Sequence, residues 1–476
     1  MQYKQVSLHI GISLRDLEDI VWQCHREGLV NIHDFESRFW DTFPAMRLHQ
    51  DSVQAPRTPA ILGLIDRIHQ EILALREQHP NLSLLFDALD ETPRQTISSP
   101  LPFTPQKPFR VLVKGEGPNG QVCVMQLKQV GADVVATESR SDHGSRAFDT
   151  RYGSLSYKNH SYLAGLLGQD SLRYLETQTD CVRFSSTDSH SPNALRASTG
   201  TFQDVFDARI RGTLKVRVWF EHELPDAPST WNLIVHTTGV SGRNRELQND
   251  TLRSQAGFFS LPGLTTYAET AVNLEHTQAT HGFVRENNYA LPNFFHVRKH
   301  VTTGRNLGPV VTHLRASIPE TERTNQLFAD IVQAPTAAFV YYMRSKTHAD
   351  EPTRFADHLK HSGFSITPDC LKTPLIEGDD CLHAFVGDAS GQSHFVGGYG
   401  QNKGSIEAAL LGRLVRAKHC LSELEAQGVS PKQLGPLHRL FTQLAKAEHE
   451  AVVELFFWNC VFDALCCHLN PTPNRT

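Results

Sequence analysis

The sequence predicts an α/β fold class, because two glycine-rich turns each follow an apolar strand and precede a helical pattern. The first turn is Gly115–Gly120 (GEGPNG), which follows the apolar run Val111–Val113. The second begins at Gly387-Asp388, after the run Leu382–Val386, and continues as a glycine-rich loop. Strand, turn and helix in this order are typical of parallel sheets that are covered by helices.

The first turn has the G-x-G-x-x-G spacing that favours a bound nucleotide. Gly115 permits the sharp turn, Gly117 lets backbone N–H groups approach a pyrophosphate, and Gly120 allows the helix to pack closely on the strand. A second apolar strand, Asp133–Thr137, is followed by Glu138, where an acid can accept a hydrogen bond from a ribose hydroxyl. This β-α-β unit predicts a Rossmann-type domain. An ordinary βαβ turn without a nucleotide is the alternative interpretation.

Three arginines, Arg140, Arg146 and Arg151, follow this unit within a polar loop. Guanidinium groups offer paired donors to phosphates and carboxylates. Arg140 lies directly beyond the expected ribose position, so we expect it to contact the nucleotide. The other two fit either phosphate contacts or a solvated loop.

Length and composition exclude several classes of protein. The 476 residues predict two or three domains. The net charge of −5, with no long basic run, disfavours binding to nucleic acid. No apolar stretch approaches the roughly 20 residues that a membrane helix needs, and the first residues lack the plan of a secretory signal. We therefore expect a cytoplasmic chain.

Cysteines and histidines do not indicate a metal site or a disulfide framework. The nine cysteines are scattered, with no C-x-x-C, so we expect reduced thiols in the core. His296 and His300 are four residues apart in a strand-like segment and lack the Glu of a metalloprotease motif. We expect no metal.

Helical patterns flank the two turns. A helix is expected to begin at Pro59, with Thr58 as its cap, because these residue types favour those positions. An apolar stripe follows them. After the second turn a helix is expected from Ser405, and the stretch Leu434–Leu469 is again helical. Between the turns, glycine turns and alternating segments indicate an antiparallel sheet within residues 251–377.

Three landmarks occur in a particular order along the chain. GEGPNG with Glu138-Ser139-Arg140 comes first, a strand ending near His236–Gly239 (HTTG) follows, and GDA with GGYGQNKG comes late. This order resembles the FAD-dependent aromatic-hydroxylase class of flavoprotein monooxygenases, which includes para-hydroxybenzoate hydroxylase. The run Pro118–Arg140, with Ser145-Arg146 and Tyr152–Gly168, looks most like the MICAL branch of that class.

The resemblance spans Phe109 to Leu424 and implies a Rossmann-type FAD-binding domain with an inserted smaller α+β substrate domain and helical N- and C-terminal arms. The expected parts are a helical N-terminal arm (1–91), a proline-rich linker (92–108), the first part of the FAD-binding domain (109–250), the substrate domain (251–377), the second part of the FAD-binding domain (378–425) and C-terminal helices (426–476).

The same resemblance implies which residues bind the cofactor. The first turn and the acid that follows it contact the ADP half of FAD, and Gly387-Asp388 contacts the ribityl chain or the pyrophosphate. The loop Gly397–Gly404 brings the start of the Ser405 helix against the flavin ring, where a helix N-terminus stabilises negative charge. The candidate cofactor-binding residues are Gly115, Gly117, Pro118, Asn119, Gly120, Glu138, Ser139, Arg140, Arg146, Gly387, Asp388, Gly400, Gln401 and Asn402.

The chain departs from the family pattern at three places. The middle motif is His236–Gly239, where the family usually has G-A-D-G, so the Asp is missing. After the late glycine the chain has Asp388–Gly391 (DASG) instead of D-A-A-H, and His394-Phe395 replaces a proline pair. These changes affect nicotinamide use and turnover more than FAD binding.

The resemblance implies an FAD-dependent monooxygenase that uses NAD(P)H and O2 to insert one oxygen atom into an organic or protein side-chain substrate. An FAD-binding interaction protein with little turnover, with a protein partner at the helical arms, is the alternative. Flavin halogenation is disfavoured because the W-x-W-x-I-P signature is absent. A plain NAD dehydrogenase or a methyltransferase leaves the late glycine-rich loop unexplained.

Overall fold

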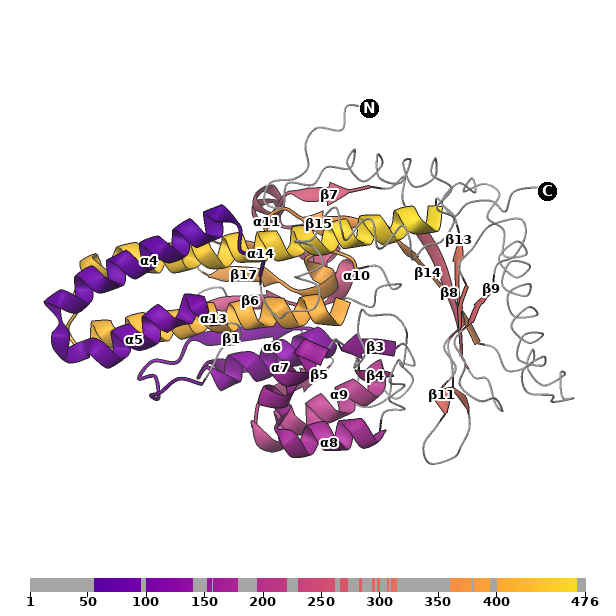
Figure 1. The fold of residues 1–476 in the computed structure, drawn as a ribbon, viewed down its shortest axis with the longest axis horizontal. Helices are drawn as coiled ribbons and strands as arrows, with labels where there is room; N and C mark the ends of the chain where they lie inside the picture. Colours follow the sequence, from indigo (N-terminus) through magenta and orange to yellow (C-terminus); the bar gives the residue numbers. More distant parts are fainter. Residues whose placement is uncertain are drawn as a thin grey trace, which may run out of the picture.

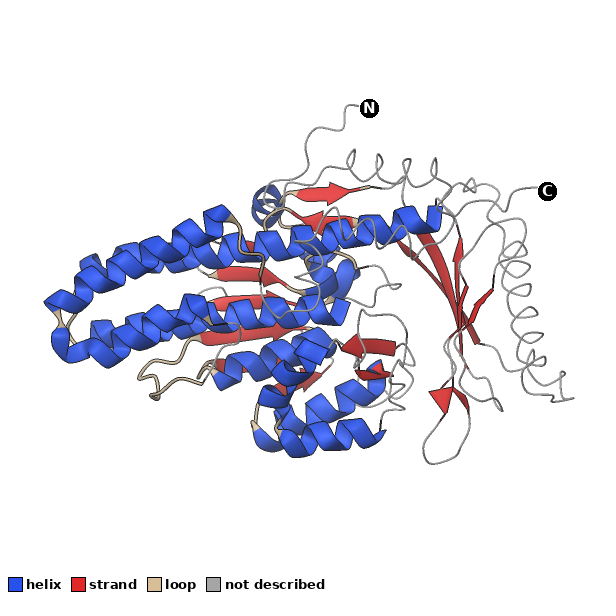
Figure 2. Cartoon of the chain, viewed as in Figure 1, coloured by secondary structure: helices blue, strands red, loops and turns tan. Residues whose placement is uncertain are grey.

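The computed structural model places a helix-covered parallel sheet beside a bundle of long helices, with a second, antiparallel sheet further along the chain (Figures 1 and 2). The structure describes residues 55–95, 100–139, 152–155, 157–178, 195–220, 230–261, 360–378, 381–393 and 400–468, and, between 262 and 359, the strands 266–272, 282–284, 293–295, 298–299, 306–307 and 310–314.

The main sheet has six strands in the order β16-β17-β6-β1-β2-β5. All neighbours are parallel except β16 and β17, which are antiparallel. Because β1, β2, β6 and β17 run in the same direction, their carboxyl ends meet at one edge of the sheet, which is where open α/β sheets bind ligands. The strand bounds are β1 Arg110–Lys114, β2 Asp133–Glu138, β5 Arg217–Phe220, β6 Leu233–His236, β16 Leu375–Glu377 and β17 Leu382–Phe385.

Helices cover both faces of this sheet. Alternate residues of a strand point to opposite faces, so Leu375 and Ala384 join the core beneath the helices α6, α13 and α14, whereas Ile376 and Phe385 contact α11 on the other side. The bounds are α6 Pro118–Gln129, α10 Gly239–Glu246, α11 Asp250–Ala256, α13 Gly400–Ala426 and α14 Pro431–His468. The predicted β-α-β unit is confirmed by β1, α6 and β2.

Further elements lie beside α6. Apolar residues of α7, α8 and α9 join the same core as the main sheet. The bounds are β3 Tyr152–Leu155, α7 Tyr157–Leu167, α8 Gln169–Gln178, β4 Leu195–Ser198, α9 Thr199–Asp207 and η3 Ala208–Thr213.

The second sheet has five antiparallel strands in the order β14-β8-β13-β10-β9. The antiparallel sheet predicted within residues 251–377 is therefore confirmed for the described strands, while the domain boundaries stay predictions. The bounds are β8 Thr266–Val272, β9 Gly282–Val284, β10 Asn293–Phe295, β13 Val310–Leu314 and β14 Lys360–Ile366, with short pairs β7 Phe258–Ser260 with β15 Asp369–Leu371 and β11 Arg298–Lys299 with β12 Asn306–Leu307.

The long helices α13 and α14 pack against α4 (Pro59–Gln78) and α5 (Ser83–Glu91), so segments from both ends of the chain lie side by side (Figure 1). The predicted start of α4 is confirmed, since the Thr58 hydroxyl accepts a hydrogen bond from the Ile61 N–H at 3.3 Å. The buried stripe of α4 joins the apolar faces of α13 and α14 in a second core cluster. The helical arm is thus packed on the helices that follow the late turn.

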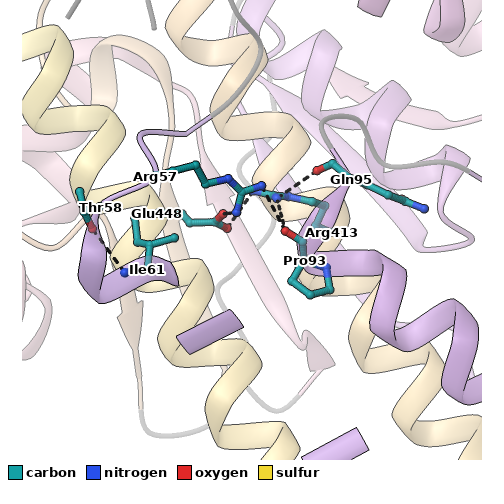
Figure 3. A network of polar contacts seen from close by, with 7 residues as sticks. All are labelled: Arg57, Thr58, Ile61, Pro93, Gln95, Arg413 and Glu448. Carbon is teal, nitrogen blue, oxygen red and sulfur yellow. Dashed lines mark hydrogen bonds and ion pairs between the residues drawn. The ribbon is translucent and has the colours of Figure 1, made fainter. Parts of the chain in front are cut away.

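A buried ion pair joins this arm to α13 and α14. An Nη atom of Arg413 donates to Glu448 at 2.8 Å, and Arg57 donates to the same carboxylate at 3.4 Å (Figure 3). Arg413 also donates to the backbone carbonyls of Pro93, at 3.4 Å, and Gln95, at 3.1 Å. One carboxylate therefore holds guanidinium groups from both ends of the chain.

The predicted reduced thiols are confirmed for the described cysteines: Cys123, Cys370, Cys381, Cys420 and Cys460 are buried and free of disulfides. Among the described helices, none combines the length and the hydropathy that crossing a membrane requires. His296 and His300, and the helices expected before residue 55, lie outside the described residues.

Replacing Glu448 with Ala leaves the buried Arg413 guanidinium without its carboxylate. Loss of one partner of a buried ion pair typically costs 3–5 kcal/mol, so we expect the free energy of unfolding to fall by about 3 kcal/mol in urea denaturation. Asp87→Ala is the control, because its pair with Arg76 is half exposed and is worth less than about 1 kcal/mol. Equal effects of the two changes would contradict the structural role of Glu448.

Candidate functional site

The first glycine-rich turn closes tightly between β1 and α6. Gly115 has a φ of +90°, in the region that favours glycine, and its N–H donates to the Thr137 carbonyl at 2.8 Å. A Cβ on Gly120 would lie 2.0 Å from the Gly115 carbonyl oxygen, so only glycine fits there. At Gly117 a Cβ would meet no atom of the described residues within 4 Å. Since Gly117 caps α6 and Pro118 is its first residue, open space lies at the positive end of a helix.

Asn119 joins this first turn to the late turn. Its Nδ2 atom donates to the Gly400 carbonyl at 3.3 Å, across 281 residues of sequence. A Cβ on Gly387 would lie 2.2 Å from Nδ2, and a Cβ on Gly404 would lie 2.2 Å from Oδ1. The Asn119 side chain is therefore packed between two glycines that must lack side chains. The structure brings the two glycine-rich turns together, as the sequence predicted.

The late turn follows β17 and exposes a single acidic side chain. Gly387 has a φ of +65°, and η7 (Gly387–Ala389) follows it. Gly387, Ala389 and Ser390 are buried, whereas Asp388 is exposed. A Cβ on Gly400 would lie 3.6 Å from the Asp388 carboxylate, so this acid lies beside the first residue of α13.

The predicted start of the helix at Ser405 is wrong, because α13 begins at Gly400. Gly400, Gln401, Asn402 and Gly404 therefore lie in the first turn of α13 and not in a loop. Glycine lowers helix propensity, which favoured a loop, but propensity is weak beside tertiary contacts. Here Gly404 must be glycine because a Cβ would lie 2.2 Å from the Asn119 side chain, so packing explains a glycine that helix propensity disfavours.

Several buried polar atoms at this junction have no hydrogen-bond partner among the described residues. A donor or acceptor that is buried without a partner is costly, so such atoms indicate a missing ligand or water. They are Asn119 Oδ1, Thr238 Oγ1, Ser393 Oγ and Gln401 Nε2. The hydroxyls of Thr238 and Ser393 and the Gln401 amide can donate, and with the space at Gly117 they fit a polar, anionic ligand that spans the two turns. The Asn119 oxygen can only accept.

Glu138 ends β2 and is turned toward the first turn. Its Oε2 atom accepts a hydrogen bond from the Glu116 N–H at 2.9 Å, and Oε1 accepts one from the Ser139 hydroxyl at 3.4 Å. A carboxylate has about four acceptor positions, so Glu138 can also accept from a ligand hydroxyl. Arg140 and Arg146 lie outside the described residues.

The middle segment His236–Gly239 supports the first turn, a role that the sequence analysis missed. The Thr237 hydroxyl lies 2.8 Å from the Lys114 carbonyl oxygen and 2.5 Å from that of Gly115. A Cβ on Gly115 would lie 3.0 Å from the Thr237 backbone. The threonine that follows β6 thus holds the turn that follows β1, and the only signal for it was its place just after an apolar strand.

A row of polar side chains, also missed, lies on the α10 side of the sheet. His236 Nε2 lies 3.1 Å from His383 Nδ1, and its Nδ1 lies 3.7 Å from Glu246, to which Lys114 donates at 3.2 Å. Burial, followed by the positive charge of Lys114 and by His383, lowers the pKa of His236 well below its ordinary value. His236 is therefore a neutral imidazole, and its ring stacks on Phe385 with 4.6 Å between centroids.

The fold is shared with solved structures, although no protein-family model matches the chain and no curated protein matches it. PqsL of Pseudomonas aeruginosa, in complex with 2-aminobenzoylacetate, is similar with a TM-score of 0.50 and 14% identity, over 76% of this chain and 97% of that one. Another PqsL structure, described as a probable FAD-dependent monooxygenase, gives a TM-score of 0.48 at 14% identity, over 76% and 97%. The p-nitrophenol 4-monooxygenase PnpA of Pseudomonas putida DLL-E4 gives 0.45 at 15% identity, over 74% and 98%.

Replacing Gly120 with Ala places a methyl group against the Gly115 carbonyl. Overpacking of this kind typically costs 1–3 kcal/mol, so we expect a loss of roughly 2 kcal/mol in the free energy of unfolding, measured without added ligand. Gly165→Ala is the control. Its Cβ would meet nothing within 4 Å inside α7, and alanine is the better helix former, so stability is unchanged or higher. A Gly120→Ala protein as stable as wild type would contradict the tight closure of the turn.

Proposed function

We propose that this protein is an FAD-dependent monooxygenase that inserts one oxygen atom from O2 into an organic substrate, with NAD(P)H as the reductant. The observation that carries the proposal is the meeting of the two glycine-rich turns around Asn119, at the carboxyl edge of a parallel sheet. A dinucleotide cofactor is long enough to need two such turns. The order of these turns resembles that of flavoprotein hydroxylases, and the fold is that of PqsL.

The residues at the junction fit FAD. The open N-terminus of α6 at Gly117 suits the pyrophosphate, because free backbone N–H groups and the helix dipole favour an anion. Glu138 suits a ribose hydroxyl, and the exposed Asp388 suits a hydroxyl of the ribityl chain. Gln401 Nε2, a buried donor without a described partner, suits an acceptor atom of the cofactor.

When bound, FAD would supply the activation of O2, and the protein would supply binding, orientation and a dry pocket. The chain's own part begins at the first turn of α13, whose N-terminus favours negative charge on a group placed before it. Beneath the first turn, the neutral His236 and the Lys114–Glu246 pair form a rigid polar layer. No step here needs a catalytic triad.

We propose a small aromatic molecule as the substrate, bound between the main sheet and the antiparallel sheet. The ligand in the PqsL structure, 2-aminobenzoylacetate, supports a compound of this size and class. A protein side chain is the substrate if the likeness to the MICAL branch extends to function. In that case the helical arms would dock the protein that carries it.

An FAD-binding interaction protein with little turnover is the second candidate. It is favoured by the middle segment, which has no acid and in which Thr237 is already engaged by the carbonyls of the first turn. Both candidates require bound FAD. They differ in whether NAD(P)H reduces it.

The first test is the visible spectrum of the purified protein after incubation with FAD and removal of the excess. We expect a yellow protein with flavin absorption, which NADPH or NADH bleaches without oxygen if the protein is a monooxygenase. Bound flavin that no nicotinamide reduces supports the second candidate. A colourless protein overturns both.

The second test replaces the proposed contacts. Gly117→Val fills the open space at the start of α6, and Asp388→Ala removes the exposed acid, so each weakens FAD binding by about tenfold or more while the fold persists. Fluorescence titration with FAD measures affinity, and far-UV circular dichroism checks folding. Gly165→Ala is the matched control. Wild-type affinity in both variants would remove this site assignment.

A further inference from the structure

A lysine of α13 is completely buried beneath the late turn. The Lys403 ammonium donates to the Gly387 carbonyl at 2.8 Å and to the Gly391 carbonyl at 2.6 Å, and its side chain is 1% exposed. A lysine loses its hydration shell at such a site, so it is rarely found there without a charged partner. Lys403 therefore needs both a compensating charge and a structural reason.

Glu407 lies one turn further along the same helix, and the positive charge of Lys403 favours its carboxylate form against the effect of burial. Its Oε2 atom accepts a hydrogen bond from the Gly387 N–H at 2.7 Å, and Oε1 accepts one from the Ser390 hydroxyl at 2.5 Å. The carboxylate and the ammonium thus hold the N–H and the C=O of one residue, Gly387. The two side chains are therefore linked through the Gly387 backbone, and buried charges are weak evidence for stability because desolvation offsets their attraction.

What this pair does fix is the position of the late turn relative to the first turn of α13. The turn carries Asp388, and α13 carries Gln401, whose Nε2 atom is buried without a described partner. If the late turn shifts, Asp388 and Gln401 can no longer contact the same ligand. Ligand sites need such supporting contacts, because small displacements cost affinity.

We propose that Lys403 and Glu407 are positioning residues for the cofactor, which hold the turn Gly387–Gly391 so that Asp388 and Gln401 contact the same molecule. This inference rests on the proposed FAD site and assigns a role to two residues that do not themselves touch the ligand. The pair acts through the backbone of the late turn.

Fluorescence titration with FAD tests the role. Lys403→Met keeps the apolar stem but leaves two carbonyls and the Glu407 carboxylate without their cation, so we expect the Kd for FAD to rise at least about tenfold. Lys403→Arg keeps the charge and recovers part of the affinity. The visible circular dichroism of the flavin that remains bound changes in Lys403→Met, because its surroundings have moved.

Arg413→Met is the matched control. Arg413 is a buried cation on the same helix, but its partners are Glu448 of α14 and the Pro93 carbonyl, and none of them belongs to the late turn. We expect it to lower the midpoint of urea unfolding while the Kd for FAD stays within about twofold of wild type. If the loss of FAD affinity resulted only from a less stable protein, Lys403→Met and Arg413→Met would both show it.

The outcomes separate the inference from the proposed function. If the wild-type protein binds no FAD, the proposed function fails. If wild type binds FAD and Lys403→Met binds it equally well, the positioning role fails. Where Lys403→Met does not fold, Glu407→Gln takes its place in a titration at about pH 8, where wild-type Glu407 is ionised and the substitution removes its charge. Unchanged affinity and dichroism in that variant overturn the inference.

The ionisation of Glu407 gives a further prediction. Burial raises its pKa to about 7, against the opposing effects of Lys403 and of its hydrogen bonds, while Asp388 raises it further. Cys123 of α6 also faces this carboxylate, and the ring of His449 in α14 lies at the Glu407 backbone. Because the folded protein favours the protonated acid, stability from this group is fully present below the ordinary pKa of Glu and is lost as pH rises through about 7.

Urea denaturation of wild type and Glu407→Gln between about pH 5 and about pH 8 measures this effect. The unfolding midpoint of wild type should fall relative to that of Glu407→Gln as the pH rises. Gly165→Ala is the control and should run parallel to wild type, because it changes no titratable group. Parallel curves for wild type and Glu407→Gln would show that Glu407 does not titrate in this range.

Discussion

The packing of Asn119 between Gly387 and Gly404 is the contact on which the candidate site depends. Any side chain added at either glycine would clash with the Asn119 amide. These three residues therefore set the distance between the two turns. The first turn, the late turn and the first residues of α13 are thereby held as one surface. A cofactor that uses both turns meets a preformed site and loses little free energy in ordering it.

The carboxyl edge of the sheet supplies the rest of that surface. Thr237, at the end of β6, holds the turn after β1, and Glu138, at the end of β2, holds the Glu116 N–H of the same turn. Both contacts come from strands that are neighbours of β1 in the sheet. The order of the strands therefore brings these side chains within hydrogen-bond distance of the turn. Among the described residues on the α10 side of the sheet, Lys114 is paired with Glu246, and His236 is neutral.

The parts that the sequence predicted are those encoded locally. Thr58-Pro59 marked the start of α4, and Gly115–Gly120 with Glu138 marked a β-α-β unit, because caps and turns depend on residues within one or two turns of chain. The start of α13 was misplaced, since Gly400 and Gly404 pack against Asn119, which is distant in sequence. Lys403 fell in the stretch that was predicted to be a loop, and nothing in the sequence indicated that Lys403 and Glu407 would be buried. Their burial depends on strands that are distant in sequence.

The network of Arg57, Arg413 and Glu448 affects whether a fragment that lacks α4 and α5 could fold. The helices α4 and α5 cover apolar residues of α13 and α14, and Arg416 of α13 donates to the Pro100 carbonyl at 2.7 Å. A fragment that began at β1 would expose this apolar surface and leave Arg413 and Arg416 without the carbonyls they bind. The helices α4 and α5 are therefore an integral part of the folding unit and not a portable attachment, so a fragment that begins at β1 is expected to be unstable as a free-standing module.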